Sequence, residues 1–232
     1  AKTQREQANE LDRRDGEDDD DEPPSSKLPT HRVRAQPDGT PKDKAQRNFT
    51  DPDSRIMVDG QGAFTQAYNA QAAVCEPSQV IVACPLSNQA PDVEYLVPVL
   101  EDVERIAGSA PQAITADTGY WSAANAQWCE AHGIDAHIAT GRRRHGQAPS
   151  TDWDTSTPRR RMTAKLRTPD GDARYRRRKA TVEPVFGQLK EASAFRRFLL
   201  RGLDKARGEW ALICAAYNLL KFFRFGGAPV CA

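Results

Sequence analysis

The stretch that decides the fold class is AITADTGYWS at residues 113–122. Its first four residues form a short apolar run that predicts a β-strand, and Asp117 ends that run with a residue typical of turns. Ser122 is well suited to begin a helix over about residues 123–131, because its hydroxyl can accept a hydrogen bond from an otherwise unpaired backbone N–H. Residues 134–139 predict a second strand. This order of strand, helix and strand is typical of an α/β domain whose sheet is flanked by helices.

The chain upstream of this stretch continues the alternation of strands and helices. Two strands are expected at residues 64–74 and 79–84, joined by a turn at residues 76–78. Apolar residues then recur at helical spacing, and Gly108 is a suitable end for the helix that opens at Pro91. We therefore expect order to begin near residue 46 and a domain to extend to about residue 225.

The chain downstream of residue 139 is expected to differ in character. Residues 140–173 are basic, polar and broken by prolines, so they predict a long loop or insertion. Helices are expected over about residues 175–198 and 205–223. Because proline lacks the backbone N–H that a helix interior uses, Pro184 suggests that the first of these helices becomes regular only near residue 182. The second helix is apolar almost all round between residues 210 and 217, which predicts that it is buried.

Charge is distributed unevenly along the chain. Residues 1–45 carry runs of charge and almost no large apolar side chain, so we expect a disordered linker there, and a short tail at residues 226–232. Residues 141–207 contain 19 Lys and Arg against 7 Asp and Glu, a balance that suits binding to a phosphate backbone. Any one basic cluster could equally be a solvated surface. No apolar stretch reaches the roughly 20 residues that cross a bilayer, so no membrane span is expected.

Two acidic residues stand out as candidates for chemistry. Asp117 follows a predicted strand, and ligands of α/β sheets gather at the carboxyl ends of strands; a turn-forming aspartate is the alternative. Glu183 is a lone acid within the basic stretch YRRRKATVEPVFGQLK at residues 175–190. On a helix it would lie near the same face as Lys190, seven residues later. The alternative is a solvated basic helix that carries an incidental glutamate.

The spacing of four residues in this stretch is specific. Tyr175, Arg178, Glu183 and Lys190 form the pattern Tyr-x2-Arg-x4-Glu-x6-Lys. This pattern resembles the signature of DDE transposases of bacterial insertion sequences, with one more residue between Arg and Glu than the better-known form has. Four further blocks are similar to one branch of that family: KAQRNFTDPDSRIM at 44–57, YNAQAAV at 68–74, ADTGY at 116–120 and FRRFLLRGL at 195–203. The similarity covers about residues 44–225.

The resemblance implies a fold and a set of site residues. It implies a ribonuclease-H-like mixed sheet flanked by helices, incomplete at its N-terminus, because the family's first acid and its Asp-Gly-Thr strand have no counterpart here. Asp117 and Glu183 would be the second and third acids, which are catalytic and bind two Mg²⁺ (or Mn²⁺) ions in the complete enzyme. The resemblance and the basic character of the second half imply contacts with the DNA backbone from Tyr175, Arg178, Lys190, Arg196 and Arg197.

The same resemblance implies an activity and a setting. The family cuts double-stranded DNA at insertion-sequence ends and joins it to a target, so the chain would be part of a metal-dependent transposase, a homodimer when complete. It would act in the bacterial cytoplasm, associated with the nucleoid. Two alternatives stay open: a catalytically inactive DNA-binding remnant, and a hydrolytic nuclease of the same fold.

Overall fold

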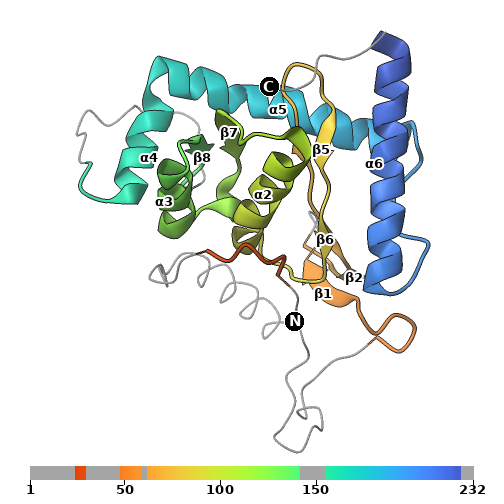
Figure 1. The fold of residues 1–232 in the computed structure, drawn as a ribbon. Helices are drawn as coiled ribbons and strands as arrows, with labels where there is room; N and C mark the ends of the chain where they lie inside the picture. The colour runs from red at the N-terminus through yellow and green to blue at the C-terminus, as the bar shows by residue number, and fades with distance from the viewer. Residues whose placement is uncertain (1–23, 30–47, 59–61, 142–154, 226–232) are drawn as a thin grey trace, which may run out of the picture. The chain divides into compact units, whose positions relative to one another are not determined.

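The computed structural model describes residues 24–29, 48–58, 62–141 and 155–225, which form two compact units (Figure 1). Among the described residues, the first unit contains residues 24–25 and 112–175, and the second contains residues 26–111 and 176–225. The linker expected at residues 1–45 lies almost wholly outside the described residues, and the tail expected at 226–232 lies outside them entirely. We describe each unit by itself.

The first unit contains the strand–helix–strand arrangement that the sequence predicts. Strands β7 (Ala113–Ala116) and β8 (Asp135–Ile138) pair in parallel, with Ala113 opposite Asp135. Helix α3 (Ala123–Ala131) connects them and packs against β8. The Ser122 hydroxyl accepts a hydrogen bond from the Asn125 backbone N–H at 2.9 Å, so Ser122 is the expected N-cap. The α/β class predicted from residues 113–122 is confirmed.

The loop predicted at residues 140–173 is wrong over its second part. Helix α4 (Pro158–Arg167) occupies this region, and helix α5 (Pro169–Glu191) begins directly after it. The Thr157 hydroxyl caps α4, and proline at the first helical position fits because its missing N–H would be unpaired there anyway. Lys165 anchors the helix: its Nζ donates to the Ala136 carbonyl at 2.8 Å and pairs with Asp135 on β8. Residues 142–154 lie outside the described residues.

The second unit contains short antiparallel strand pairs and helix α2. Strands β1 (Arg55–Val58) and β2 (Phe64–Ala67) form a hairpin, β3 (Asn69–Ala70) pairs with β6 (Leu86–Ser87), and β4 (Ala73–Val74) pairs with β5 (Ile81–Ala83). After the 3-10 turn η1 (Val93–Tyr95), helix α2 (Leu96–Ala107) packs against β4 and β5 and ends at Gly108, whose φ of +80° favours glycine.

The sheet arrangement differs from a single continuous sheet in the described residues. The strand expected over residues 64–74 is divided into three short strands, and the four strand pairs are separate two-stranded sheets. The mixed composition of strands and helices is confirmed, whereas one central ribonuclease-H-like sheet stays a prediction. Among the described residues, no helix is both long and apolar enough to span a bilayer.

Helices α5 and α6 (Leu203–Phe225) supply most of one core cluster of the second unit, and η1 and α2 bury further apolar side chains in that unit. The fully buried side chains of this core come from α5, α6 and two strands: Ile81, Leu86, Val185, Leu189, Ala206, Trp210, Cys214 and Tyr217. The prediction that residues 210–217 are buried is confirmed for Trp210, Cys214 and Tyr217 and wrong for the residues between them. Leu212 and Leu219 are 69% and 70% exposed, because only the stripe at three- and four-residue spacing from Trp210 faces the core.

The prediction that α5 becomes regular only near residue 182 is also wrong. The helix continues through Pro184. Proline at this position leaves the carbonyl of Ala180, four residues earlier, without its helical donor. The Gln79 Nε2 replaces that donor at 3.0 Å, and the Gln79 Oε1 accepts a hydrogen bond from the Lys221 Nζ at 2.8 Å. A side chain from the β4–β5 turn thus connects α5 to α6 and stabilises the proline-containing helix.

Candidate functional site

Asp117 lies directly after β7, at the strand end where the sequence places it. Its side chain accepts a hydrogen bond from the Gly119 backbone N–H at 3.1 Å and begins the 3-10 turn η2 (Thr118–Tyr120). The turn-forming role that the sequence left open is therefore present. An ionised carboxylate has about four lone-pair sites, so this bond is compatible with a second role as a cation ligand.

Glu183 lies in the middle of α5, and its side chain is exposed. It belongs to the second unit, whereas Asp117 belongs to the first, so the structure describes each carboxylate within its own unit. Among the described residues, no three His, Cys, Asp or Glu side chains form a group that could hold a metal ion. The magnesium site and its two acidic ligands stay predictions.

Tyr175 and Arg178 are both partly buried on α5. Tyr175 is the last residue of the first unit, and Arg178 belongs to the second. The neighbouring Arg177 is already engaged, because its Nη1 lies 3.1 Å from the Glu76 Oε1. The basic run of α5 is therefore not a uniform phosphate-binding surface.

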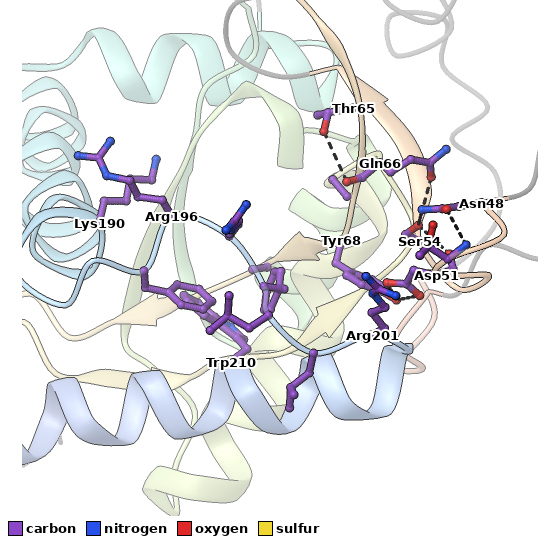
Figure 2. A pocket seen from close by; sticks show the side chains of 18 of the residues that line it. Asn48, Asp51, Ser54, Thr65, Gln66, Tyr68, Lys190, Arg196, Arg201 and Trp210 are labelled. Carbon is purple, nitrogen blue, oxygen red and sulfur yellow. Dashed lines mark hydrogen bonds between the residues drawn. The ribbon is translucent and has the colours of Figure 1, made fainter.

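The other three predicted DNA contacts lie together. Lys190, Arg196 and Arg197 line one cavity of about 830 Å³ in the second unit (Figure 2). Its walls come from residues 48–54, strand β2, the end of α5 and residues 195–201, which we name the arginine segment. Residues that are distant in the sequence thus build one site.

The floor of this cavity is aromatic. Trp210 of α6 is 2% exposed, and its Nε1 donates to the Gln71 carbonyl at 3.1 Å. The rings of Phe195 and Phe186 stack against it, with centroid distances of 6.0 and 6.2 Å. Aromatic side chains that pack in this way have few rotamers available, so the floor provides a rigid base for the charged rim.

The rim of the cavity carries four cations. Figure 2 shows Lys190 and Arg196 at one end, and Arg201 near Asp51 and Tyr68 at the other. The Arg196 Nη2 contacts both oxygens of Glu191, at 2.7 and 2.8 Å. Arg197 and Arg201 are exposed and have no ion pair among the described residues.

This combination of groups suits a polyanion. A guanidinium group can bind a phosphate through two parallel hydrogen bonds, and a lysine ammonium adds a point charge. The cavity therefore has the charges that contact with a nucleic acid backbone needs.

Among the described residues that line the cavity, one is acidic, Asp51. Its two carboxylate oxygens accept hydrogen bonds from the Tyr68 hydroxyl at 2.7 and 2.8 Å, and one of them accepts the Gly202 backbone N–H at 3.1 Å. Burial and the neighbouring carboxylate raise the pKa of Tyr68 above its ordinary value, so the phenol remains a donor near neutral pH. The negative charge of Asp51 is thus directed at protein donors.

A family comparison decides which class of protein contains this cavity. The family model described as "Transposase DDE domain" matches residues 31–219, well over half of the chain. The chain belongs to this family. No curated protein and no solved structure gives a significant match.

The match to the transposase DDE domain includes every site residue that the sequence predicts. Asp117, Tyr175, Arg178, Glu183, Lys190, Arg196 and Arg197 all lie between residues 31 and 219. The cavity of the second unit lies within the same range, because its lining residues run from Asn48 to Trp210. A basic cavity and the two candidate acids thus belong to one transposase domain.

Sequence reasoning missed several residues of the cavity. Arg201 was not singled out, although it stands in the same FRRFLLRGL block as Arg196 and Arg197. The contacts of Asp51 with the Gly202 backbone join that block to the DPDSR block 151 residues earlier. Both blocks were visible as family-like stretches, but no local pattern shows that they touch.

Proposed function

We propose that this chain is part of a metal-dependent DNA transposase whose second unit binds DNA backbone phosphates in the cavity of Figure 2. The observation that supports this most is the gathering of Lys190, Arg196 and Arg197 around one cavity, together with Arg201, in a chain of the transposase DDE domain family. The substrate is double-stranded DNA at insertion-sequence ends and at the target. The complete enzyme acts as a homodimer in the bacterial cytoplasm, associated with the nucleoid.

We also propose Asp117 and Glu183 as two of the catalytic carboxylates. Their oxygens match the hard-donor preference of Mg²⁺, and the exposed Glu183 is accessible to DNA and to ions. A pair of divalent ions, when bound, supplies activation of the oxygen nucleophile and stabilisation of the leaving oxygen. The task of Asp117 and Glu183 is to hold these ions, and that of the cavity arginines is to hold the DNA strand.

The binding half of this proposal is tested by the salt dependence of DNA affinity, measured by fluorescence anisotropy with a labelled duplex. Each phosphate contact that is lost should reduce the slope of log K against log [salt] by about 1. We expect this reduction for Arg197→Ala and for Arg201→Ala. The matched control is Arg105→Ala, which removes an exposed arginine of α2 outside the cavity. An equal effect of the control would contradict a phosphate site in this cavity.

The catalytic half is tested by strand cleavage and joining of a labelled insertion-sequence end in the presence of Mn²⁺. We expect Glu183→Gln to abolish cleavage and leave DNA affinity within about twofold, because it removes a metal ligand and no phosphate contact. Glu104→Gln on α2, another exposed glutamate, is the control. Binding without metal-dependent cleavage by the unmodified chain would favour the inactive DNA-binding remnant. Cleavage without joining would favour the hydrolytic nuclease.

A further inference from the structure

The arginine segment, residues 195–201, is neither helix nor strand, yet hydrogen bonds to a side chain of α6 hold its backbone. Glu209 of α6 accepts hydrogen bonds from the Leu199 backbone N–H at 2.9 and 3.0 Å, and from the Leu200 backbone N–H at 2.9 Å. Carboxylate acceptors form stronger hydrogen bonds than neutral ones. A single side chain therefore fixes two consecutive peptide groups in the middle of the segment.

The C-terminal end of the segment is held in the same way. Asp51, which is 9% exposed, accepts the Gly202 backbone N–H at 3.1 Å, and Asp53 accepts the Leu203 backbone N–H at 3.0 Å. Gly202 has a φ of +86°, a conformation that glycine adopts without steric cost. The Tyr68 hydroxyl bonds both oxygens of Asp51 and so fixes the orientation of that carboxylate.

These carboxylates have an unexpected location for a DNA-binding site. Asp51 lines the cavity, and Glu209 bonds to the backbone between Arg197 and Arg201. Acidic groups near a phosphate backbone repel it, so considered by charge alone they weaken DNA binding. Each of these carboxylates instead accepts hydrogen bonds from backbone N–H groups of the arginine segment or of the first residues after it. These bonds stabilise the segment and so offset the repulsion.

We propose that Asp51 and Glu209 are positioning residues, which hold the arginine segment by its backbone in the conformation that presents Arg196, Arg197 and Arg201 to DNA phosphates. This inference rests on the proposed DNA-binding function of the cavity. The physical reason is entropic: an irregular segment that is already ordered loses less conformational freedom when DNA binds. The carboxylates do not touch DNA, and Tyr68 acts through Asp51.

The decisive test is the sign of the change in affinity when one carboxylate is neutralised. Glu209→Gln removes a negative charge, so charge alone predicts tighter binding of a DNA duplex. Positioning predicts weaker binding, by about fivefold, because a neutral amide oxygen is a weaker acceptor than a carboxylate and the amide NH2 group cannot accept a backbone N–H at all. Asp204→Asn is the matched control: it removes the same charge from the same helix, where Asp204 is exposed and pairs only with Arg207 among the described residues.

A second variant separates positioning from charge altogether. Tyr68→Phe removes only the hydroxyl that orients Asp51, with no change in charge. We expect weaker DNA binding at every salt concentration with an unchanged salt slope, since the arginines still reach the same phosphates. We also expect faster trypsin cleavage after Arg197 and Arg201 under conditions where circular dichroism shows the fold intact. A merely structural role would lower the melting temperature without this local change.

The outcomes distinguish this inference from the proposed function. If Arg197→Ala weakens binding but Glu209→Gln binds as tightly as Asp204→Asn, and Tyr68→Phe binds like the unmodified chain, the positioning role is overturned and DNA binding stands. If the unmodified chain shows no salt-dependent DNA binding, both proposals are overturned. Weaker binding by both variants, with the salt slope preserved, supports the positioning role.

Discussion

At the scale of single residues, strand β8 of the first unit carries a buried histidine, His137, and a partly exposed carboxylate, Asp135, that pairs with helix α4. His137 on β8 is 3% exposed, and its Nδ1 lies 3.2 Å from the Asp135 carbonyl oxygen. Lys165 of α4 pairs with Asp135, and Arg174 of α5 lies 3.9 Å from the same carboxylate. Burial, and then the positive charge of Lys165, hold the pKa of His137 below its ordinary value, so the folded unit favours the neutral imidazole.

This depressed pKa predicts a pH-dependent stability. A histidine that is neutral when folded binds a proton more readily when unfolded, so its contribution is present above pH about 6.5 and is lost as the pH falls below it. We expect the free energy of unfolding, measured by urea denaturation, to decrease between pH 7 and 5, with at most about 1.4 kcal/mol per pH unit from this residue. His137→Gln should flatten the profile. Parallel profiles for the two proteins would contradict the assignment.

At the scale of elements, α5 and α6 show how tertiary contacts override local signals. The sequence predicts an interruption near Pro184, but Gln79 supplies the donor that proline removes, and the helix continues. The sequence also predicts that residues 210–217 of α6 are buried, but the helix has one buried stripe and one exposed apolar stripe. The partner that decides the outcome lies far along the chain in both cases: Gln79 for α5, and strands β5 and β6 for α6. A short window of sequence around either helix does not contain its partner.

The one-sided burial of α6 predicts unequal effects of two truncations on the same helix. Trp210→Ala removes a side chain that is 2% exposed and should lower the free energy of unfolding by about 3–5 kcal/mol. Leu212→Ala removes a side chain that is 69% exposed and should change it by about 0.5 kcal/mol or less. Urea denaturation monitored by circular dichroism measures both. A large loss for Leu212→Ala would show that this stripe is covered in solution.

At the scale of the whole molecule, the net charge of +1 conceals how the charges are arranged. Acidic residues dominate the first 30 positions, and basic residues dominate residues 141–207. The cavity of the second unit gathers four cations around an aromatic floor, and its acid faces protein donors. DNA affinity should therefore depend on the local cluster and little on the total charge, because salt screens charges that are more than about 10 Å apart.

A charge-compensated double variant tests this dependence. Arg197→Ala combined with Glu104→Gln keeps the net charge at +1, since one positive and one negative charge are removed. We expect the double variant to bind a DNA duplex as weakly as Arg197→Ala alone, within about twofold, in anisotropy titrations at 0.1 M salt. Recovery of the original affinity would show that net charge governs binding and that the cavity has no special role.

The sequence by itself determined the helices and strands that depend on interactions between neighbouring residues. The strand ending at Asp117, the Ser122 cap, and the helix that stops at Gly108 follow from short-range periodicity and hydrogen bonding, and the spacing from Tyr175 to Lys190 identified the family. The sequence also predicts that Asp117 and Glu183 are metal ligands, and this stays a prediction.

Only the tertiary structure decided which distant segments meet within each unit. Asp51 meets the Gly202 backbone 151 residues later, Gln79 meets Ala180 101 residues later, and Lys165 of α4 bonds to the Ala136 carbonyl of β8, 29 residues earlier. Helix periodicity and capping are properties of neighbouring residues and can be read from a short window. These contacts depend on how distant segments pack, which no local pattern encodes, and for that reason the arginine segment and its carboxylate supports emerged only from the folded chain.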